Sequence, residues 1–225
     1  MAHKNNYVLD GQIAPSATEL TSLLPQEWKW SWYRREVKKH GWRGWQKCDA
    51  TSNRGKRIGS HVHAMVEALL KGESYTAYLD KDRGILESPK RTSHMWEMAH
   101  TVLAELDHGP DMLVEQHLVN HALGIHGTAD YITDSIDDLK TSNKISPEYA
   151  VQLAIYAACW NEANPADPKT TGRIIRVDKV AKKPYIQKKL YENLSQYLPV
   201  VKALRIIWSF INNKPLPDFF KQDVA

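Results

Sequence analysis

Residues 124–141 read GIHGTADYITDSIDDLKT, and this stretch decides the fold. The spacing of its apolar side chains is typical of strands rather than of helices. We therefore predict strands over 124–133 and 135–141, with a tight turn near Asp134 between them. A third strand, over 112–119, is expected directly before them. The three consecutive strands would form an antiparallel meander.

Two aspartates and a lysine in this stretch carry a chemical signal. Alternate side chains of a strand point to opposite faces, so Asp138 and Lys140 share one face. Pairing in register across the turn would lay Asp130 beside Asp138. Carboxylates this close repel unless a cation lies between them, which suits Mg²⁺ or Mn²⁺, and a nearby lysine can orient an attacking water. Taken alone, an Asp-x-Lys pattern is also typical of a surface hairpin with scattered charges.

The rest of the chain supplies helices and further strands. Apolar periodicity predicts helices over 60–70, 89–107 and 146–162, strands over 171–179 and 184–190, and a closing helix over 191–212. Upstream we expect a loose lead-in over 1–15, helices over 16–24 and 25–39, and a mobile basic loop over 40–57. This order predicts an α/β fold with a central mixed sheet flanked by helices, plus N-terminal helical additions.

Four short patterns in a fixed order resemble a known family. They are Gly59 with His63, Gly127 with Asp130, Asp138 with Lys140 and Thr141, and Gln152 with Tyr156. Together they resemble the PD-(D/E)XK nuclease superfamily, in particular the small phage-type and mitochondrial genome maintenance members of its RecB-like exonuclease branch. The resemblance implies a restriction-endonuclease-like core over 59–225 and a separate helical, basic, Trp-rich region over 1–58.

The resemblance also implies a catalytic centre. Asp130, Asp138 and Lys140 would be the catalytic residues, and His63 would bind the metal together with the two aspartates. The implied cofactor is Mg²⁺ or Mn²⁺. Without the family, His63 would more often be interpreted as a core or surface histidine.

Three further residues are accessory candidates. Gln152 and Tyr156 lie four apart on one helical face, where they would contact the DNA end or support Lys140. Glu115 lies where these nucleases often have an acidic residue before Gly-x-x-Asp, and it could equally be a paired surface carboxylate.

The sequence departs from the family pattern at two positions. Ala129 replaces the proline of the family name, and Asp138 stands where many members have glutamate. Cys48 and Cys159 are the only cysteines, so no iron–sulfur cluster is expected.

Charge is segregated along the chain, although the formal net charge is only +4. Residues 28–57 carry a local net charge of +8 and five of the eight tryptophans, whereas residues 80–138 carry −8. Aromatic side chains among basic ones suit a nucleic-acid strand, and the alternative is that the indoles pack a helical subdomain. The predicted DNA-binding residues are Arg43, Lys47, Arg54, Lys56 and Arg57.

These observations predict a Mg²⁺-dependent exonuclease that hydrolyses phosphodiester bonds at DNA ends in recombination, repair or phage DNA processing. A structure- or sequence-specific endonuclease of the same fold and a non-catalytic DNA-binding or interaction protein stay open as alternatives. The expected partners are DNA and a separate single-strand annealing or recombination protein, and an oligomer stays open. A polar opening over 1–10 and the lack of a long apolar stretch favour the cytoplasm, with no membrane partner.

Overall fold

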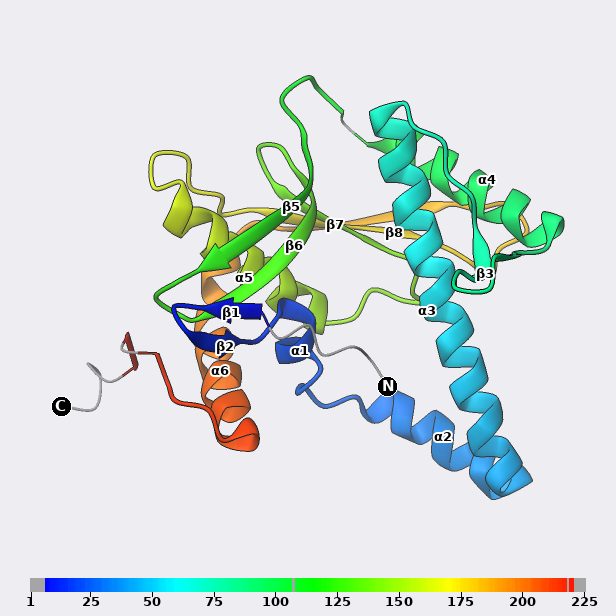
Figure 1. Ribbon diagram of the computed structural model, residues 1–225, viewed down its shortest axis with the longest axis horizontal. Helices are drawn as coiled ribbons and strands as arrows, with labels where there is room; N and C mark the ends of the chain where they lie inside the picture. The colour runs from blue at the N-terminus through cyan, green and yellow to red at the C-terminus, as the bar shows by residue number, and fades with distance from the viewer. Residues whose placement is uncertain (1–6, 107, 218, 221–225) are drawn as a thin grey trace.

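The computed structural model describes residues 7–106, 108–217 and 219–220. A five-stranded mixed sheet lies at its centre in the order β5-β6-β7-β8-β9 (Figure 1). The strands are β5 Leu113–Asn120, β6 Ile125–Ile132, β7 Ile136–Lys140, β8 Gly172–Val177 and β9 Ile186–Tyr191. Strands β7 and β8 run parallel, and the other neighbouring pairs are antiparallel.

Strands β5, β6 and β7 form the predicted antiparallel meander. The register pairs Tyr131 with Asp137 and Ile132 with Ile136, so Asp130 comes opposite Asp138 as expected. The predicted α/β class is confirmed. The chain has N-terminal helices and a mixed central sheet flanked by helices, an arrangement consistent with a restriction-endonuclease-like core.

Helices cover both faces of this sheet. They are α1 Ala17–Thr21, α2 Glu27–His40, α3 Trp42–Lys71, α4 Pro89–Glu105, α5 Glu148–Ala163, the short 3-10 helix η1 Leu194–Tyr197 and α6 Leu198–Asn212. One apolar core joins α1, α5 and α6 to Ile174, and the other joins α3 and α4 to Ile175. Successive residues of β8 therefore point into opposite cores, as expected of a strand that is covered on both faces.

The N-terminal segment is more ordered than the expected lead-in. Residues 1–6 lie outside the described residues, but β1 (Tyr7–Leu9) and β2 (Gln12–Ala14) form an antiparallel hairpin. Its turn uses positive φ angles at Asp10 and Gly11, which such tight hairpins require. A second small hairpin consists of β3 (Tyr78–Asp80) and β4 (Ile85–Leu86).

The prediction of a mobile loop over 40–57 is wrong, because residues 42–57 belong to the 30-residue helix α3. Glycines and polar residues favour loops locally, but packing against α2 outweighs that preference. At Gly44 the two helices approach so closely that a Cβ would overlap the Glu36 carbonyl oxygen. Tyr33 of α2 packs edge-on against Trp45 of α3, with ring centroids 4.9 Å apart.

The indoles of the basic stretch divide between packing and exposure. Trp45 packs between Tyr33 and Trp42. By contrast, Trp42 is 70% exposed and Trp30 is 50% exposed. The α2–α3 hairpin therefore presents aromatic side chains to solvent alongside its basic ones.

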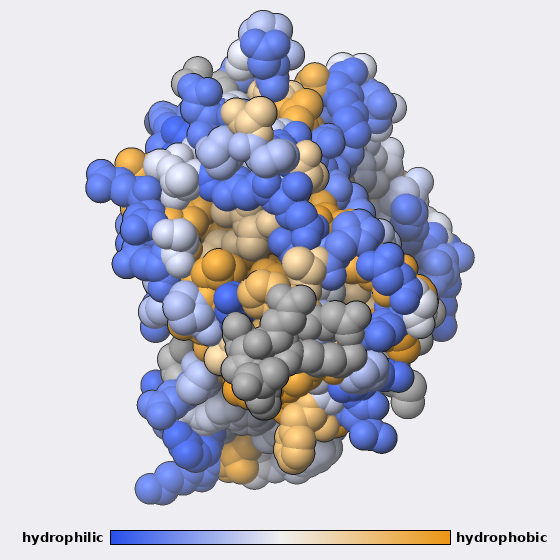
Figure 2. Space-filling view, turned by 90° about the vertical axis from the view of Figure 1, so that its left-hand side faces the viewer, coloured by the Kyte–Doolittle hydropathy of each residue, from blue (hydrophilic) through white to orange (hydrophobic). Residues whose placement is uncertain are grey.

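The C-terminal part of the fold departs from the predictions in detail. Helix α5 begins at Glu148 rather than at residue 146, and the Ser146 hydroxyl bonds the Glu148 side chain. Tyr191 ends β9, so the closing helix α6 begins only at Leu198. On the side of the molecule that carries α6, apolar side chains reach the surface (Figure 2). Within the described residues, none of the helices has the length and apolar character needed to cross a membrane.

Candidate functional site

Helix α3 brings His63 to the central sheet. Its Nδ1 lies 3.2 Å from Oδ1 of Asp130 on β6. The other Asp130 oxygen, Oδ2, accepts the backbone N–H of Leu139 on β7 at 2.6 Å. His61 faces away and bonds the Tyr75 hydroxyl, as the helical spacing predicts. Asp130 therefore connects α3, β6 and β7 at one buried point.

Glu115 reaches the same point from β5. The residues before and after it pair with Tyr131 and Ala129, so Glu115 comes opposite Asp130. Its φ of 51° lies in the left-handed region, which is rare for a residue other than glycine. Such backbone strain costs about 1–3 kcal/mol and is concentrated at functional sites.

His63, Glu115 and Asp130 form a group that can hold a metal ion. One ligand atom from each residue lies within 4.8 Å of the others. An imidazole nitrogen with two carboxylates is a donor set that divalent cations such as Mn²⁺ and Mg²⁺ accept. The site thus combines one helix and two neighbouring strands.

The electrostatics of this group also favour a cation. Burial raises the pKa of Glu115 to about 7, and the Asp130 carboxylate contributes in the same direction. Burial would also raise the pKa of Asp130, but the charge and hydrogen bond of His63 hold it below its usual value. Burial opposes the charged form of His63, and Asp130 nevertheless raises its pKa overall. A divalent cation would offset the repulsion between the two carboxylates.

Asp138 and Lys140 form an ion pair beside this group. Lys140 Nζ lies 2.5 Å from Asp138 Oδ2, and its ammonium lies over the Tyr149 ring at 5.1 Å. Burial, together with the Asp130 charge, raises the pKa of Asp138 to about 6 despite Lys140. Burial opposes the charged form of Lys140, but the Asp138 and Asp130 carboxylates raise its pKa overall. Asp138 is the one predicted metal ligand outside the three-residue group.

Gln152 and Tyr156 lie in the core under the site. The Gln152 side-chain amide donates to the Tyr156 hydroxyl at 2.6 Å, and both residues are buried. A Cβ at Gly127 would lie 2.6 Å from the Tyr156 ring, so the tyrosine packs where only glycine fits. Both side chains are buried and bonded to each other, and their contact with a DNA end or support of Lys140 stays a prediction.

The five predicted DNA-binding residues have different surroundings on α3. Lys47 pairs with Glu36 of α2 at 3.1 Å. Arg57 pairs with the buried Glu87 at 2.6 Å and so has a structural ion pair. The remaining three, which are Arg43, Arg54 and Lys56, are exposed.

Glu115 belongs to the metal-compatible group, whereas the family resemblance implies only an accessory role for it. Its left-handed backbone and its place opposite Asp130 depend on the pairing of β5 with β6. Local sequence patterns do not predict this pairing. The usable signal was the acidic residue one strand before Asp130.

The fold and this site together define a class: an α/β protein with a mixed central sheet flanked by helices and a His/Glu/Asp group that can hold a metal ion. In sequence comparisons, no family model and no curated protein matches the chain. Among solved structures, the chain is similar to "Crystal structure of SSO0001", with 14% identity and a TM-score of 0.43. That match covers 96% of this chain and 80% of the other.

Proposed function

We propose that this protein is a divalent-metal-dependent deoxyribonuclease that hydrolyses phosphodiester bonds at DNA ends, as an exonuclease of recombination, repair or phage DNA processing. One observation carries the proposal. His63, Glu115 and Asp130 converge within 4.8 Å, and Asp130 comes opposite Asp138, which is paired with Lys140.

The residues present fit a metal ion. Glu115 combines a strained backbone with a carboxyl whose pKa is raised to about 7, and a nearby positive charge would relieve that shift. His63, Glu115 and Asp130 would hold the ion. When bound, Mg²⁺ or Mn²⁺ would polarise the scissile phosphate and lower the pKa of the attacking water.

Lys140 supplies a fixed positive charge. Its pKa is raised by Asp138 and Asp130 against the effect of burial, so the side chain stays an ammonium at neutral pH. An ammonium can donate hydrogen bonds to a phosphate oxygen and offset the negative charge that develops there. Asp138 orients Lys140 through the 2.5 Å ion pair.

The first test measures DNA hydrolysis with Mg²⁺ for the wild type and Lys140→Ala. We expect Lys140→Ala to reduce kcat by about 10²- to 10³-fold, because one preorganised donor to the developing charge is lost. Lys90→Ala, which removes an exposed lysine of α4, is the matched control and should hydrolyse at the wild-type rate. Equal activity of wild type and Lys140→Ala, or no activity in either, would contradict the assignment.

Cleavage assays on linear and on closed circular DNA distinguish an exonuclease from an endonuclease. An end-dependent exonuclease leaves the circle intact, whereas an endonuclease of the same fold cuts it. Binding of DNA without metal-dependent cleavage would instead support a non-catalytic DNA-binding protein.

A further inference from the structure

Lys179 lies directly beyond β8, and its ammonium lies against helix α3. A Cβ placed on Gly55 would be only 3.0 Å from Lys179 Nζ, so the amine occupies the space that this glycine leaves open. The residue is partly buried. Within the described part of the chain, Lys179 Nζ has no hydrogen-bond or ion-pair partner.

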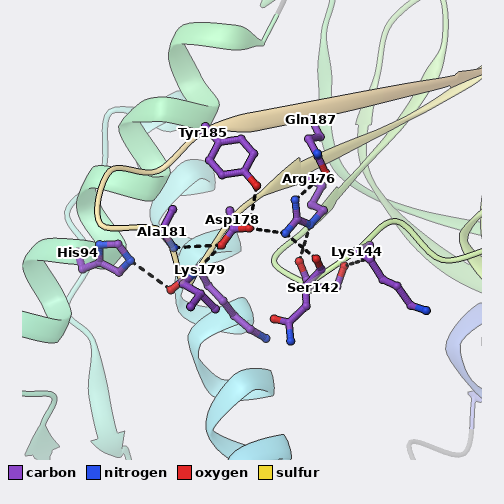
Figure 3. Close-up of polar contacts among 11 residues, drawn as sticks. His94, Ser142, Lys144, Arg176, Asp178, Lys179, Ala181, Tyr185 and Gln187 are labelled. Atoms are coloured by element: carbon purple, nitrogen blue, oxygen red, sulfur yellow. Dashed lines mark hydrogen bonds and ion pairs between the residues drawn. The ribbon is translucent and has the colours of Figure 1, made fainter. Parts of the chain in front are cut away.

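The acid beside it is occupied by other groups. Asp178 accepts Arg176 Nη2 at 2.6 Å and the Tyr185 hydroxyl at 3.1 Å (Figure 3). It also accepts two backbone N–H groups, from Val180 at 2.8 Å and Ala181 at 3.1 Å. The Asp178 carboxylate therefore accepts its hydrogen bonds from groups of its own turn and its neighbours, and none from the Lys179 amine.

The same network fixes the backbone from which Lys179 extends. Arg176 donates to the carbonyl oxygens of Ser142 at 2.6 Å and Asn143 at 2.8 Å, in the connection that follows β7. On the other side, His94 of α4 lies 3.3 Å from the carbonyl oxygen of Lys179 (Figure 3). The end of β8 is thus tied to β7 and α4, while the lysine side chain points toward α3.

Lys179 lies in a row that ends at the candidate metal site. Successive turns of α3 place Gly55 against Lys179, Gly59 against the Thr141 hydroxyl and His63 against Asp130. Residues four apart share one face of a helix, and eight residues span about 12 Å. Along one side of α3, the row therefore runs from the residues just beyond β8 and β7 to Asp130 within β6.

A partly buried ammonium without an acidic partner is unfavourable unless an anion joins it. Burial lowers the pKa of Lys179, and Arg176 lowers it further against the opposing charge of Asp178. A phosphate group supplies the missing negative charge, and lysine binds phosphates as a point charge.

We propose that Lys179 is a phosphate-binding residue that contacts the sugar–phosphate backbone of the substrate strand, along α3 from the candidate metal site. The inference rests on the proposed function, because it takes a nucleic-acid strand as the ligand. It extends that function by adding a positioning contact from the end of β8. Lys179 belongs to none of the four short sequence patterns that resemble the nuclease superfamily.

The test measures binding of a fluorescein-labelled single-stranded DNA oligonucleotide to the full chain, with Ca²⁺ in place of Mg²⁺, at several salt concentrations. Lys179→Gln should weaken binding by about 10-fold, as expected for one charge-assisted hydrogen bond. It should also reduce the slope of log K against log salt by about 0.7, the value for one phosphate contact on a single strand. Lys179→Arg should keep most of the binding affinity and most of the salt slope.

Two controls separate this role from a structural one. Lys183→Gln, in the same connection but beside Trp96 and His100 of α4, removes the same charge and should bind as wild type does. Thermal unfolding of Lys179→Gln should show an unchanged or higher Tm, because an unpaired, partly buried charge is removed. A lowered Tm together with unchanged binding would show a structural role and overturn the proposal.

Failure of this inference can be told apart from failure of the proposed function. Equal affinity and equal salt slope for wild type and Lys179→Gln, in a protein that hydrolyses DNA, overturn the Lys179 contact alone. Absence of hydrolysis by the wild type, together with Lys179-dependent binding, overturns the hydrolase and supports the phosphate contact. A wild type that does not bind the oligonucleotide overturns the Lys179 contact as well.

Discussion

Among the site residues, Glu115 combines an unfavourable backbone conformation with an unfavourable neighbouring charge. Its backbone is strained at a φ of 51°, and its carboxyl comes opposite Asp130 in the neighbouring strand. Neither feature helps the chain to fold without a cation. Both are explained if the residue is held ready for a metal ion.

The titration of Glu115 gives a pH prediction for the metal-free protein. Its pKa is raised from 4.5 to about 7, first by burial and then by Asp130, so the folded state holds a proton that the unfolded state has released. Its contribution to stability is therefore complete below about pH 4.5 and is lost as the pH rises through about 7. Glu115→Gln should remove this loss and gain about 1–2 kcal/mol relative to wild type at pH 8, an amount reduced by partial solvent screening.

Urea unfolding at pH 5 and pH 8, with a chelator present, checks this expectation. Asp134→Asn, an exposed carboxyl in the turn between β6 and β7, is the matched control and should follow the wild type. If Glu115→Gln and wild type lose the same free energy of unfolding between the two pH values, the raised pKa of Glu115 is refuted.

At the scale of elements, the meander and the second half of helix α3 were predictable, and the first half of α3 was not. The strand-like spacing on both sides of Asp134 is a local property, so the register that brings Asp130 opposite Asp138 followed from the sequence. The first half of α3 contains glycines and polar residues that are individually poor in helices. Its helical state depends on contacts with α2, which sequence spacing does not reveal. The conformation of Glu115 likewise depends on its partner strand, so local sequence does not reveal it.

The close approach of α2 and α3 gives a stability prediction. Gly44→Ala places a methyl group in overlap with a backbone oxygen of α2, which cannot move without shifting the helix. We expect a loss of about 1–3 kcal/mol in the free energy of unfolding. Gly55→Ala is the control, because its new methyl meets only the flexible end of Lys179, and it should be neutral or stabilising by up to about 1 kcal/mol.

Chemical denaturation of both variants measures this difference. The close contact of α2 with α3 at Gly44 requires Gly44→Ala to be less stable than Gly55→Ala. Equal midpoints for Gly44→Ala and Gly55→Ala would contradict the close helix contact.

At the scale of the whole molecule, the two charged segments fall on different parts of the fold. The +8 stretch over 28–57 covers α2 and the first half of α3, which extend away from the central sheet (Figure 1). The −8 stretch over 80–138 contains the acidic residues of β5, β6 and β7. A basic extension beside an acidic, metal-compatible centre suits a substrate that is a polyanion.

The central claim is that Asp130, with His63 and Glu115, holds a divalent cation used to hydrolyse DNA. The most direct test is the Mg²⁺-dependent release of nucleotides from linear DNA by wild type, Asp130→Asn and the control Asp134→Asn. We predict that a chelator stops the wild type and the Asp134→Asn control alike, and that Asp130→Asn is slower by about 10³-fold or more. Release that persists with chelator, or Asp130→Asn working at the wild-type rate, would contradict the claim.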